Sequence, residues 1–363
     1  MDMMYIEDCC EILDSMRVPI TASDREEGDY PYYGANGIQD HVADYIFDDE
    51  LVLLAEDGGN FGSKEKPIAY RVSGKCWINN HAHVLKPKIG LDVDYLCYSL
   101  MFYNVDGMVN GATRQKLTQA AMRKMQIPSR SIEDQKHIVD ELNRIVKIKE
   151  QRFLELQLLD KLIKARFVEM FGDCSNMVLL NDLCLIITDG THQPPKFQEK
   201  GIPFILVSNL SNNTVTYNTE KYISEETYNE LYKRTPIEPG DLLLSTVGSY
   251  GHPAVVTEDI RFLFQRHIAY LRPKRELVNS FYLHSALLAP DGQRQIEEKV
   301  KGIAQKTLNL SEIRKIMIPL PKMEEQDKFA AFVHQVDKSK VVVQKALDEA
   351  QILFDSLMQK YFG

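Results

Sequence analysis

One stretch of this sequence has the residue types of a catalytic site. Pro290-Asp291, followed by Glu297-Glu298-Lys299, matches the pattern of a magnesium-dependent nuclease. In such a nuclease two carboxylates hold Mg²⁺ and a lysine lies near the attacking water. The carboxylates must converge from adjacent strands, whereas we expect residues 293–301 to be helical. We therefore interpret the match as coincidental, and a nuclease is our third hypothesis.

The sequence also offers a pair of histidines, His81 and His83, two residues apart on a predicted strand. It supplies no further ligands at metal-site spacing, so we predict no metal site. It contains no Walker A loop, no G-x-G-x-x-G and no G-x-S-x-G. The adenine-methyltransferase signature is missing too, because Pro194-Pro195 follows Gln193. The sequence therefore shows none of these enzyme signatures.

Other polar side chains suit nucleic-acid recognition, because amide, hydroxyl, imidazole and guanidinium groups donate to phosphates and base edges. Asp189-Gly190-Thr191-His192 predicts a polar turn, and basic clusters recur at 114–116 and 305–306. An ordinary solvated loop is the alternative for any single residue. The candidate DNA contacts are Asn36, Asn60, Lys64, Lys66, Arg71, Lys75, Arg114, Gln115, Lys116, Thr191, His192, Lys196, Ser249, Tyr250, His252, Arg266, Gln305 and Lys306.

The sequence contains an internal repeat, and the elements of this repeat must position these side chains. Residues 111–172 align without a gap on residues 302–363, at an offset of 191. Weaker matches precede each copy: residues 50–54 parallel 241–245 at the same offset, and residues 81–87 parallel 267–273 at an offset of 186. We predict a first globular domain at 1–110, a first spacer of loop and helix at 111–173, a second globular domain at 174–301 and a second spacer at 302–363.

Each spacer should contain a long helix, because residues 133–171 and 324–362 hold neither proline nor glycine. At 1.5 Å per residue, such a helix forms a rod of about 60 Å. Both copies carry an apolar seam at coiled-coil spacing, interrupted at Lys149 and at its counterpart Lys340. We expect the two helices to pair antiparallel and to hold the globular domains apart. The predicted pairing residues are Ile138, Leu142, Ile145, Leu156, Leu159, Ile163, Phe329, Val333, Val336, Val343, Leu347 and Phe354.

The globular domains contain short apolar or alternating runs bounded by turn residues, which predict a mixed, strand-rich α+β fold. The expected strands are 50–55, 68–72, 76–85, 204–207, 241–247 and 254–257, with helices at 93–103 and 279–301.

Composition is that of an ordinary globular protein, with 363 residues, 44% of them apolar, and a net charge of −9. Residues 1–110 carry 8 basic and 20 acidic side chains, which is unfavourable for contact with a polyanion. No apolar run approaches the roughly 18 residues of a membrane helix. The acidic start lacks a signal pattern, and six cysteines in a long chain are typical of reduced thiols. We therefore expect a cytoplasmic protein that does not contact membranes.

The whole chain resembles the specificity subunits of type I restriction–modification systems. The resemblance rests on the twofold layout and on residues 30–38 (YPYYGANGI) and 189–192 (DGTH). It also rests on a duplicated helix-entrance pattern, Ile-Pro and then acid-acid-Gln. That pattern reads Gly111 to Leu117, Ile127-Pro128 and Glu133-Asp134-Gln135 in the first copy. In the second it reads Gly302 to Leu308, Ile318-Pro319 and Glu324-Glu325-Gln326.

This resemblance implies that each globular domain recognises one half of a bipartite, asymmetric site in double-stranded DNA. The helices would act as spacer and as docking surface for two methyltransferase subunits. The chain itself would catalyse nothing and would bind no cofactor. Restriction/translocase subunits would complete the complex, and S-adenosylmethionine, ATP and Mg²⁺ would bind to the partner subunits. The alternative is a two-headed coiled-coil scaffold that binds proteins and not DNA, for which the acidic first domain is the best support.

Overall fold

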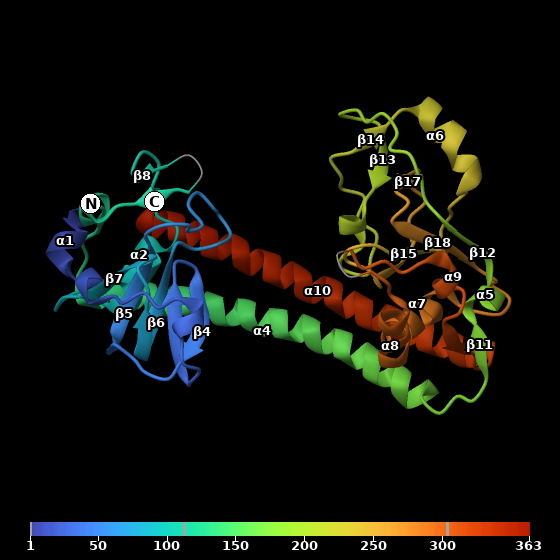
Figure 1. Ribbon diagram of the computed structural model, residues 1–363, viewed down its shortest axis with the longest axis horizontal. Coiled ribbons are helices and arrows are strands. Elements are labelled where there is room, and N and C mark those ends of the chain that lie inside the picture. The colour runs from blue at the N-terminus through green and yellow to red at the C-terminus, as the bar shows by residue number, and fades with distance from the viewer. Residues whose placement is uncertain (1, 112–113, 303–304) are drawn as a thin grey trace. The chain divides into compact units, whose positions relative to one another are not determined.

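The computed structural model describes residues 2–111, 114–302 and 305–363 of the protein (Figure 1). The chain divides into two compact units. Unit 1 comprises Met1–Arg152 together with Ala346–Gly363, and unit 2 comprises Phe153–Lys345. Each unit therefore contains one globular part and a portion of both long helices.

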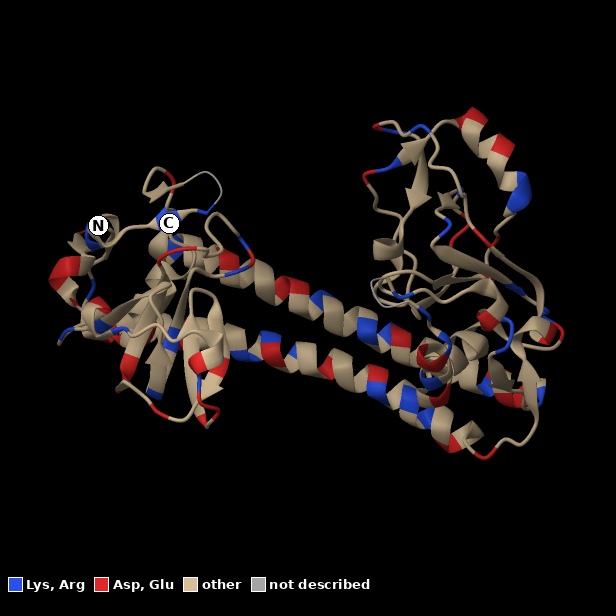
Figure 2. Ribbon diagram, in the orientation of Figure 1, with Lys and Arg blue, Asp and Glu red and all other residues tan. Residues whose placement is uncertain are grey.

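The two long helices are α4, Ile132–Phe171, and α10, Met323–Phe362. Each begins one residue before the predicted start and ends at the predicted residue. Figure 2 shows acidic and basic residues interspersed along both helices. Among the described residues, no helix has the length and apolar character needed to cross a membrane.

Unit 1 is built on a six-stranded sheet with the order β2-β7-β5-β6-β3-β4. Helix α2 packs on β5 and β6, and two small pairs, β1-β10 and β8-β9, flank the sheet. The elements are β1 Met3–Tyr5, α1 Ile6–Cys9, β2 Cys10–Ile12, β3 Tyr30–Gly34, β4 Gly37–Val42, β5 Phe47–Ala55, β6 Ala69–Ile78, β7 Ala82–Pro87, α2 Val93–Met101, β8 Val109–Asn110, β9 Lys116–Leu117, α3 Gln119–Arg123 and β10 Gln126–Pro128.

Unit 2 has a four-stranded sheet, β12-β18-β15-β16, and a three-stranded sheet, β14-β13-β17. A further pair, β11-β19, corresponds to β1-β10 of unit 1. The elements are β11 Met177–Leu179, α5 Leu180–Leu183, β12 Cys184–Asp189, β13 Ile202–Ile205, β14 Tyr222–Ile223, α6 Glu225–Leu231, β15 Leu242–Ser245, β16 Pro253–Val255, β17 Leu263–Phe264, β18 Ile268–Pro273, α7 Ser280–Leu288, α8 Pro290–Lys299, α9 Leu310–Ile313 and β19 Met317–Pro319.

Two predicted elements are wrong in extent. Residues 76–85 do not form one strand, because β6 ends at Ile78 and β7 begins at Ala82, with a turn between them. Residues 279–301 do not form one helix. Pro290 cannot continue α7, since it lacks an N–H and its ring clashes with the preceding turn, and it instead begins α8.

The helices run antiparallel within each unit. In unit 1 the first turns of α4 pack against the last turns of α10, where Ile138, Leu142 and Ile145 share a core with Ala350 and Phe354. In unit 2 the last turns of α4 meet the first turns of α10. Phe167 and Phe171 there lie 5.5 and 5.6 Å from Phe329, measured between ring centroids.

The other seam positions differ in burial. Val333, Val336 and Val343 are buried, whereas Leu156, Leu159, Ile163 and Leu347 are only half-buried. The predicted α+β class with paired long helices is confirmed.

The internal repeat recurs as matched hydrogen bonds. The backbone N–H of Leu117 donates to the carbonyl of Glu56 at 2.7 Å, and that of Leu308 donates to the carbonyl of Thr246 at 2.8 Å. Leu117 and Leu308 are related by the predicted offset of 191, but Glu56 and Thr246 are related by 190. The predicted offset for residues 50–54 and 241–245 is therefore wrong by one residue.

Candidate nucleic-acid interface

In unit 1 three turns meet at one edge of the sheet. The amide of Asn36, in the β3–β4 hairpin, donates to the carbonyl of Gly58 at 3.0 Å. The N–H of Gly58 in turn donates to the carbonyl of Gln115 at 3.2 Å. This edge therefore gathers the β3–β4, β5–β6 and 114–117 loops, which carry several of the predicted DNA contacts.

The loop that enters each spacer depends on glycine. Gly111 and Gly302 adopt φ angles of +103° and +100°, where a side chain is strained. A Cβ atom would also lie 2.3 Å from the carbonyl oxygen of Arg114, or 2.4 Å from that of Gln305. This geometry explains why both copies of the repeat begin with glycine.

The polar edge of unit 1 is neutralised by carboxylates that the sequence analysis did not single out. Asp57 accepts from Arg114 at 2.7 Å and contacts His81 Nδ1 at 2.6 Å. Glu56 pairs with Lys116 at 2.9 Å and with Arg17 at 2.6 Å. Arg114 and Lys116, predicted as phosphate contacts, are therefore already paired with acidic side chains.

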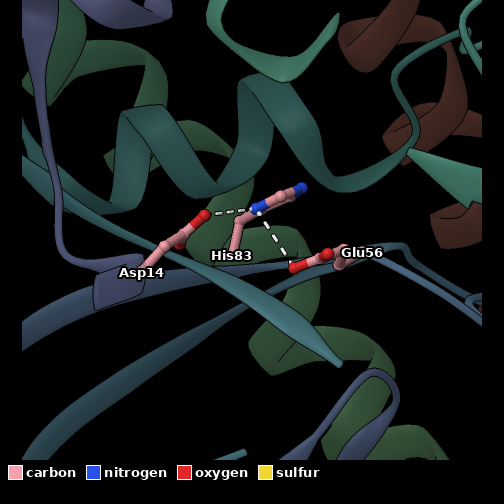
Figure 3. Close-up of side chains that lie close together, drawn as sticks. All are labelled: Asp14, Glu56 and His83. Carbon is pink, nitrogen blue, oxygen red and sulfur yellow. Dashed lines mark hydrogen bonds and ion pairs between the residues drawn. The ribbon is translucent and has the colours of Figure 1, made fainter. Parts of the chain in front are cut away.

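Behind this edge lies a buried polar cluster. His83 lies between Asp14 and Glu56 (Figure 3), with its Nδ1 2.7 Å from the carboxylate of Asp14. Its Nε2 lies 2.9 Å from the carbonyl oxygen of Leu117. Both ring nitrogens of His83 therefore face protein oxygen atoms. Burial would raise the pKa of Asp14, but the hydrogen bonds from His83 and Gln119 outweigh it and lower the pKa.

Asp14, Glu56 and His83 are close enough to hold a metal ion, so the structure does supply the further ligands that the sequence did not reveal. Their ligand atoms are engaged, however. Both oxygens of Glu56 bind cationic side chains, and both nitrogens of His83 face protein oxygens. The cluster therefore acts as an ion-pair network that ties the 116–117 strand to the sheet.

The corresponding edge of unit 2 begins at Asp189, at the end of β12. Asp189 pairs with Arg234 at 2.8 Å and with His192 at 3.0 Å. The next loop joins the spacer as in unit 1, because the N–H of Gly248 donates to the carbonyl of Lys306 at 3.2 Å. The backbone of Thr191 also bonds that of Arg266. The structure thus brings the predicted residues 191–192, 249–250, 266 and 305–306 to one edge.

The nuclease-like residues lie on α8, near this edge. Asp291 and Glu298 both pair with Arg294, and Glu297 binds Tyr250 and Lys306. These carboxylates come from one helix and not from adjacent strands, as we expected from the sequence.

Five of the predicted contacts are held by neighbouring side chains or by their own loop. Arg71, on β6, pairs with Glu50 and Asp94, and Lys75 lies over the ring of Tyr45 at 4.5 Å. The amide of Asn60 holds its own loop through the carbonyl of Pro67, at 3.4 Å. His252 is half-buried beside Asn213, and burial lowers its pKa. Lys306 is paired with Glu297 at 3.1 Å. Four candidates not yet placed by a contact, Lys64, Lys66, Lys196 and Ser249, are exposed.

The residues that sequence reasoning missed are Asp14, Glu56, Asp57 and Arg234. One signal for the first three was available, because the match of residues 81–87 with 267–273 marks the turn that holds His81 and the strand β7 that carries His83. Their acidic partners lie at least 24 residues away in the sequence and follow only from the strand order.

Two related units on paired long helices, each with loops gathered at one edge, define the architecture of a DNA-specificity subunit. The family model for the type I restriction modification DNA specificity domain matches residues 1–158 and 175–350. The protein therefore belongs to this family and acts as a DNA sequence-specificity subunit, and the scaffold alternative is not favoured.

Known proteins agree with this assignment. A Haemophilus influenzae protein described as a type I restriction enzyme specificity subunit is 26% identical, over 98% of this chain and 92% of its own length. The EcoBI specificity subunit of Escherichia coli is 31% identical, over 48% of this chain and 37% of its own. The S subunit structure from M. genitalium shares the fold, with a TM-score of 0.58 and 15% identity, covering 100% of this chain and 96% of that one.

Proposed function

We propose that the protein directs a type I restriction–modification complex to a bipartite, asymmetric DNA site, with each unit recognising one half. One observation carries this proposal: the two units share a backbone arrangement but differ in the side chains of the loops at their edges. Matched hydrogen bonds present the spacer loop in both units, yet Asp57 and Arg114 in unit 1 correspond to Val247 and Gln305 in unit 2. Two edges of different chemistry suit two different half-sites.

The long helices serve as the spacer and as the docking surface for two methyltransferase subunits. On α4 the apolar side chains of Leu154, Leu158 and Leu162 recur every four residues and are about half exposed. On α10 the counterpart of Leu162 is Leu353, which is 51% exposed. The counterparts of Leu154 and Leu158 are Lys345 and Glu349. The exposed apolar position that both helices share, Leu162 and Leu353, suits two copies of one partner.

The protein itself catalyses nothing in this proposal. The carboxylates of α8 are held by Arg294, Tyr250 and Lys306, which supports this assignment. The methyltransferase subunits bind S-adenosylmethionine and take the target adenine out of the duplex. The restriction/translocase subunits bind ATP and Mg²⁺, and the complex works in the cytoplasm.

Exchange of residues 174–301 for the second unit of another family member tests this function. The methylated motif should change in one half and keep the other half, while exchange of residues 1–110 should do the reverse. A scaffold would lose assembly or leave the motif unchanged in both exchanges.

A further inference from the structure

Unit 2 contains an open pocket of about 270 Å³ at the edge where its loops gather. It is lined by the end of β12, the end of β15, the turn before β18 and the spacer loop. The lining residues that determine its charge and its space are Asp189, Thr246, Val247, Arg266, His267 and Gln305. A water molecule occupies about 30 Å³, so the pocket has room for a small polyatomic anion with its water.

This pocket occupies the place of the ionic cluster of unit 1. The N–H of Glu56 donates to the carbonyl of His81 at 2.9 Å, and the N–H of Thr246 donates to that of His267 at 2.9 Å. One residue further on, Asp57 and Val247 bridge to the spacer loop in the same way. Thr246 and Val247 are therefore the counterparts of Glu56 and Asp57.

The spacer loop shows the same replacement. The bridge partner of Asp57 is Lys116, and the bridge partner of Val247 is Thr307. Unit 1 thus fills this place with two carboxylates and the cations that they neutralise. Unit 2 has short, uncharged side chains there, which leaves the space open.

The charge that remains in the pocket is positive. Its carboxylate, Asp189, is balanced by Arg234 at 2.8 Å and by His192. Within the described ranges, the guanidinium of Arg266 has no ion-pair partner and donates only to His267 Nε2, at 3.4 Å. The Thr246 hydroxyl likewise has no hydrogen-bond partner there. An exposed guanidinium and a free hydroxyl at one pocket form a donor set for an oxyanion.

We propose that this pocket binds one phosphate of the DNA backbone through Arg266, and that unit 1 has no equivalent contact because Glu56 and Asp57 occupy its place. This inference rests on the proposed function, since the phosphate belongs to the half-site that unit 2 recognises. It also assigns the two units unequal electrostatic roles, in line with the excess of acidic side chains in residues 1–110.

The test combines a protein variant with a DNA modification. The full chain, wild type or Arg266→Ala, binds a duplex containing its site in which single phosphates are replaced by uncharged methylphosphonates. Charge-assisted hydrogen bonds are worth about ten- to a hundredfold in affinity. One methylphosphonate in the half-site of unit 2 should weaken wild-type binding by that factor. It should leave the already weakened variant unaffected.

Two matched variants sharpen the test. Val247→Asp restores the carboxylate of unit 1 and should weaken binding like Arg266→Ala, with the salt dependence of log K reduced by about one phosphate in both. Arg275→Ala removes an arginine of unit 2 that is paired with Glu238 and should bind as wild type does.

If every methylphosphonate weakens Arg266→Ala as much as wild type, the pocket binds no phosphate and the inference is overturned, while the proposed function stands. If the wild-type chain does not distinguish its site from other sequences, the proposed function fails, and the inference fails with it.

Discussion

Gln135 accepts a hydrogen bond from the backbone N–H of Asp92, with 2.8 Å between Oε1 and N, and thereby fastens the start of α4 to the start of α2. Its Nε2 donates to the carbonyls of Gly90 and Arg130, at 3.0 and 2.9 Å. Gln326 makes the matching bond to the N–H of Asn279 at 2.9 Å. Both glutamines are buried. The acid-acid-Gln pattern that marks each spacer is therefore a packing device and not a DNA contact.

Substitution of this glutamine should destabilise its unit. Gln135→Ala leaves the N–H of Asp92 and two carbonyls without their partner, so we expect a loss of about 2–3 kcal/mol in the free energy of unfolding. Gln326→Ala should cost a similar amount. Denaturant titration measures the loss, and Gln157→Ala, at an exposed position of α4, is the control. A loss no larger than that of the control would contradict the role assigned to Gln135.

The buried cluster of unit 1 should make stability depend on pH through Asp14. Because the folded protein lowers the pKa of Asp14, its carboxylate stabilises the fold above the unfolded pKa of about 3.9. That contribution is lost as the pH falls through the folded pKa. Asp14→Asn should therefore be less stable than wild type at pH 7, by about 3 kcal/mol, because it replaces the buried carboxylate that contacts His83 and accepts from Gln119 and from the N–H of Val84.

The difference between Asp14→Asn and wild type should shrink as the pH falls below about 4, because Asp14 of the unfolded chain takes up a proton there while folded Asp14 is protonated only at a lower pH. Unfolding titrations from pH 2 to pH 7 measure it. Asp106→Asn, on an exposed turn, should match wild type throughout. A stability difference that stays constant over this range would show that the charge of Asp14 is not what stabilises the cluster.

Replacement of the lysine in the seam of α10 should stabilise unit 2. Lys340 is 25% exposed and pairs with Asp160 at 2.7 Å and Asp337 at 3.2 Å. A polar residue at a seam position fixes the register at a cost in stability. We expect Lys340→Leu to raise the free energy of unfolding by about 1 kcal/mol.

Asp160→Ala, which removes the partner and keeps the lysine, should instead lower the free energy of unfolding by at most about 1 kcal/mol, since the carboxylate is well exposed. Both changes appear as shifts of the denaturation midpoint. If Lys340→Leu is less stable than wild type, Lys340 stabilises the fold and does not only fix the register of the two helices.

Charged residues on the exposed face of α4 should block assembly without unfolding the protein. Leu158→Glu together with Leu162→Glu places two charges where we expect an apolar partner surface. Co-purification should show loss of the methyltransferase subunit, while circular dichroism stays unchanged. Gln157→Glu, on the same helix, should assemble normally. Undiminished assembly of the double variant would place the docking surface elsewhere.

The long helices follow from the sequence because their determinants are local. The absence of proline and glycine over 39 residues and a repeating apolar seam are enough to place α4 and α10 to within one residue. The glutamine of each spacer is also visible as a pattern, although its role is not. Its partners, Asp92 and Gly90, lie more than 40 residues away and become neighbours only in the folded unit.

The two polar edges could be predicted less well, because charge pairing across strands does not show in a linear pattern. Arg114 and Lys116 look like free phosphate contacts until β5 brings Asp57 and Glu56 beside them. Arg266 has the same appearance in the sequence, yet in the structure it remains unpaired among the described residues. The predicted alignment of residues 50–54 with 241–245 was also wrong by one residue. The correspondence of these two strands is fixed by the strands they pair with and not by sequence identity.

A map of methylated adenines in the source genome tests most directly whether this protein selects a bipartite DNA site. Cells with the gene should show one methylated motif, made of two short blocks around an unspecified gap. Cells without the gene should lack methylation at that motif and keep all other methylation. The same methylome in both cells, when the partner subunits are expressed, would contradict this role.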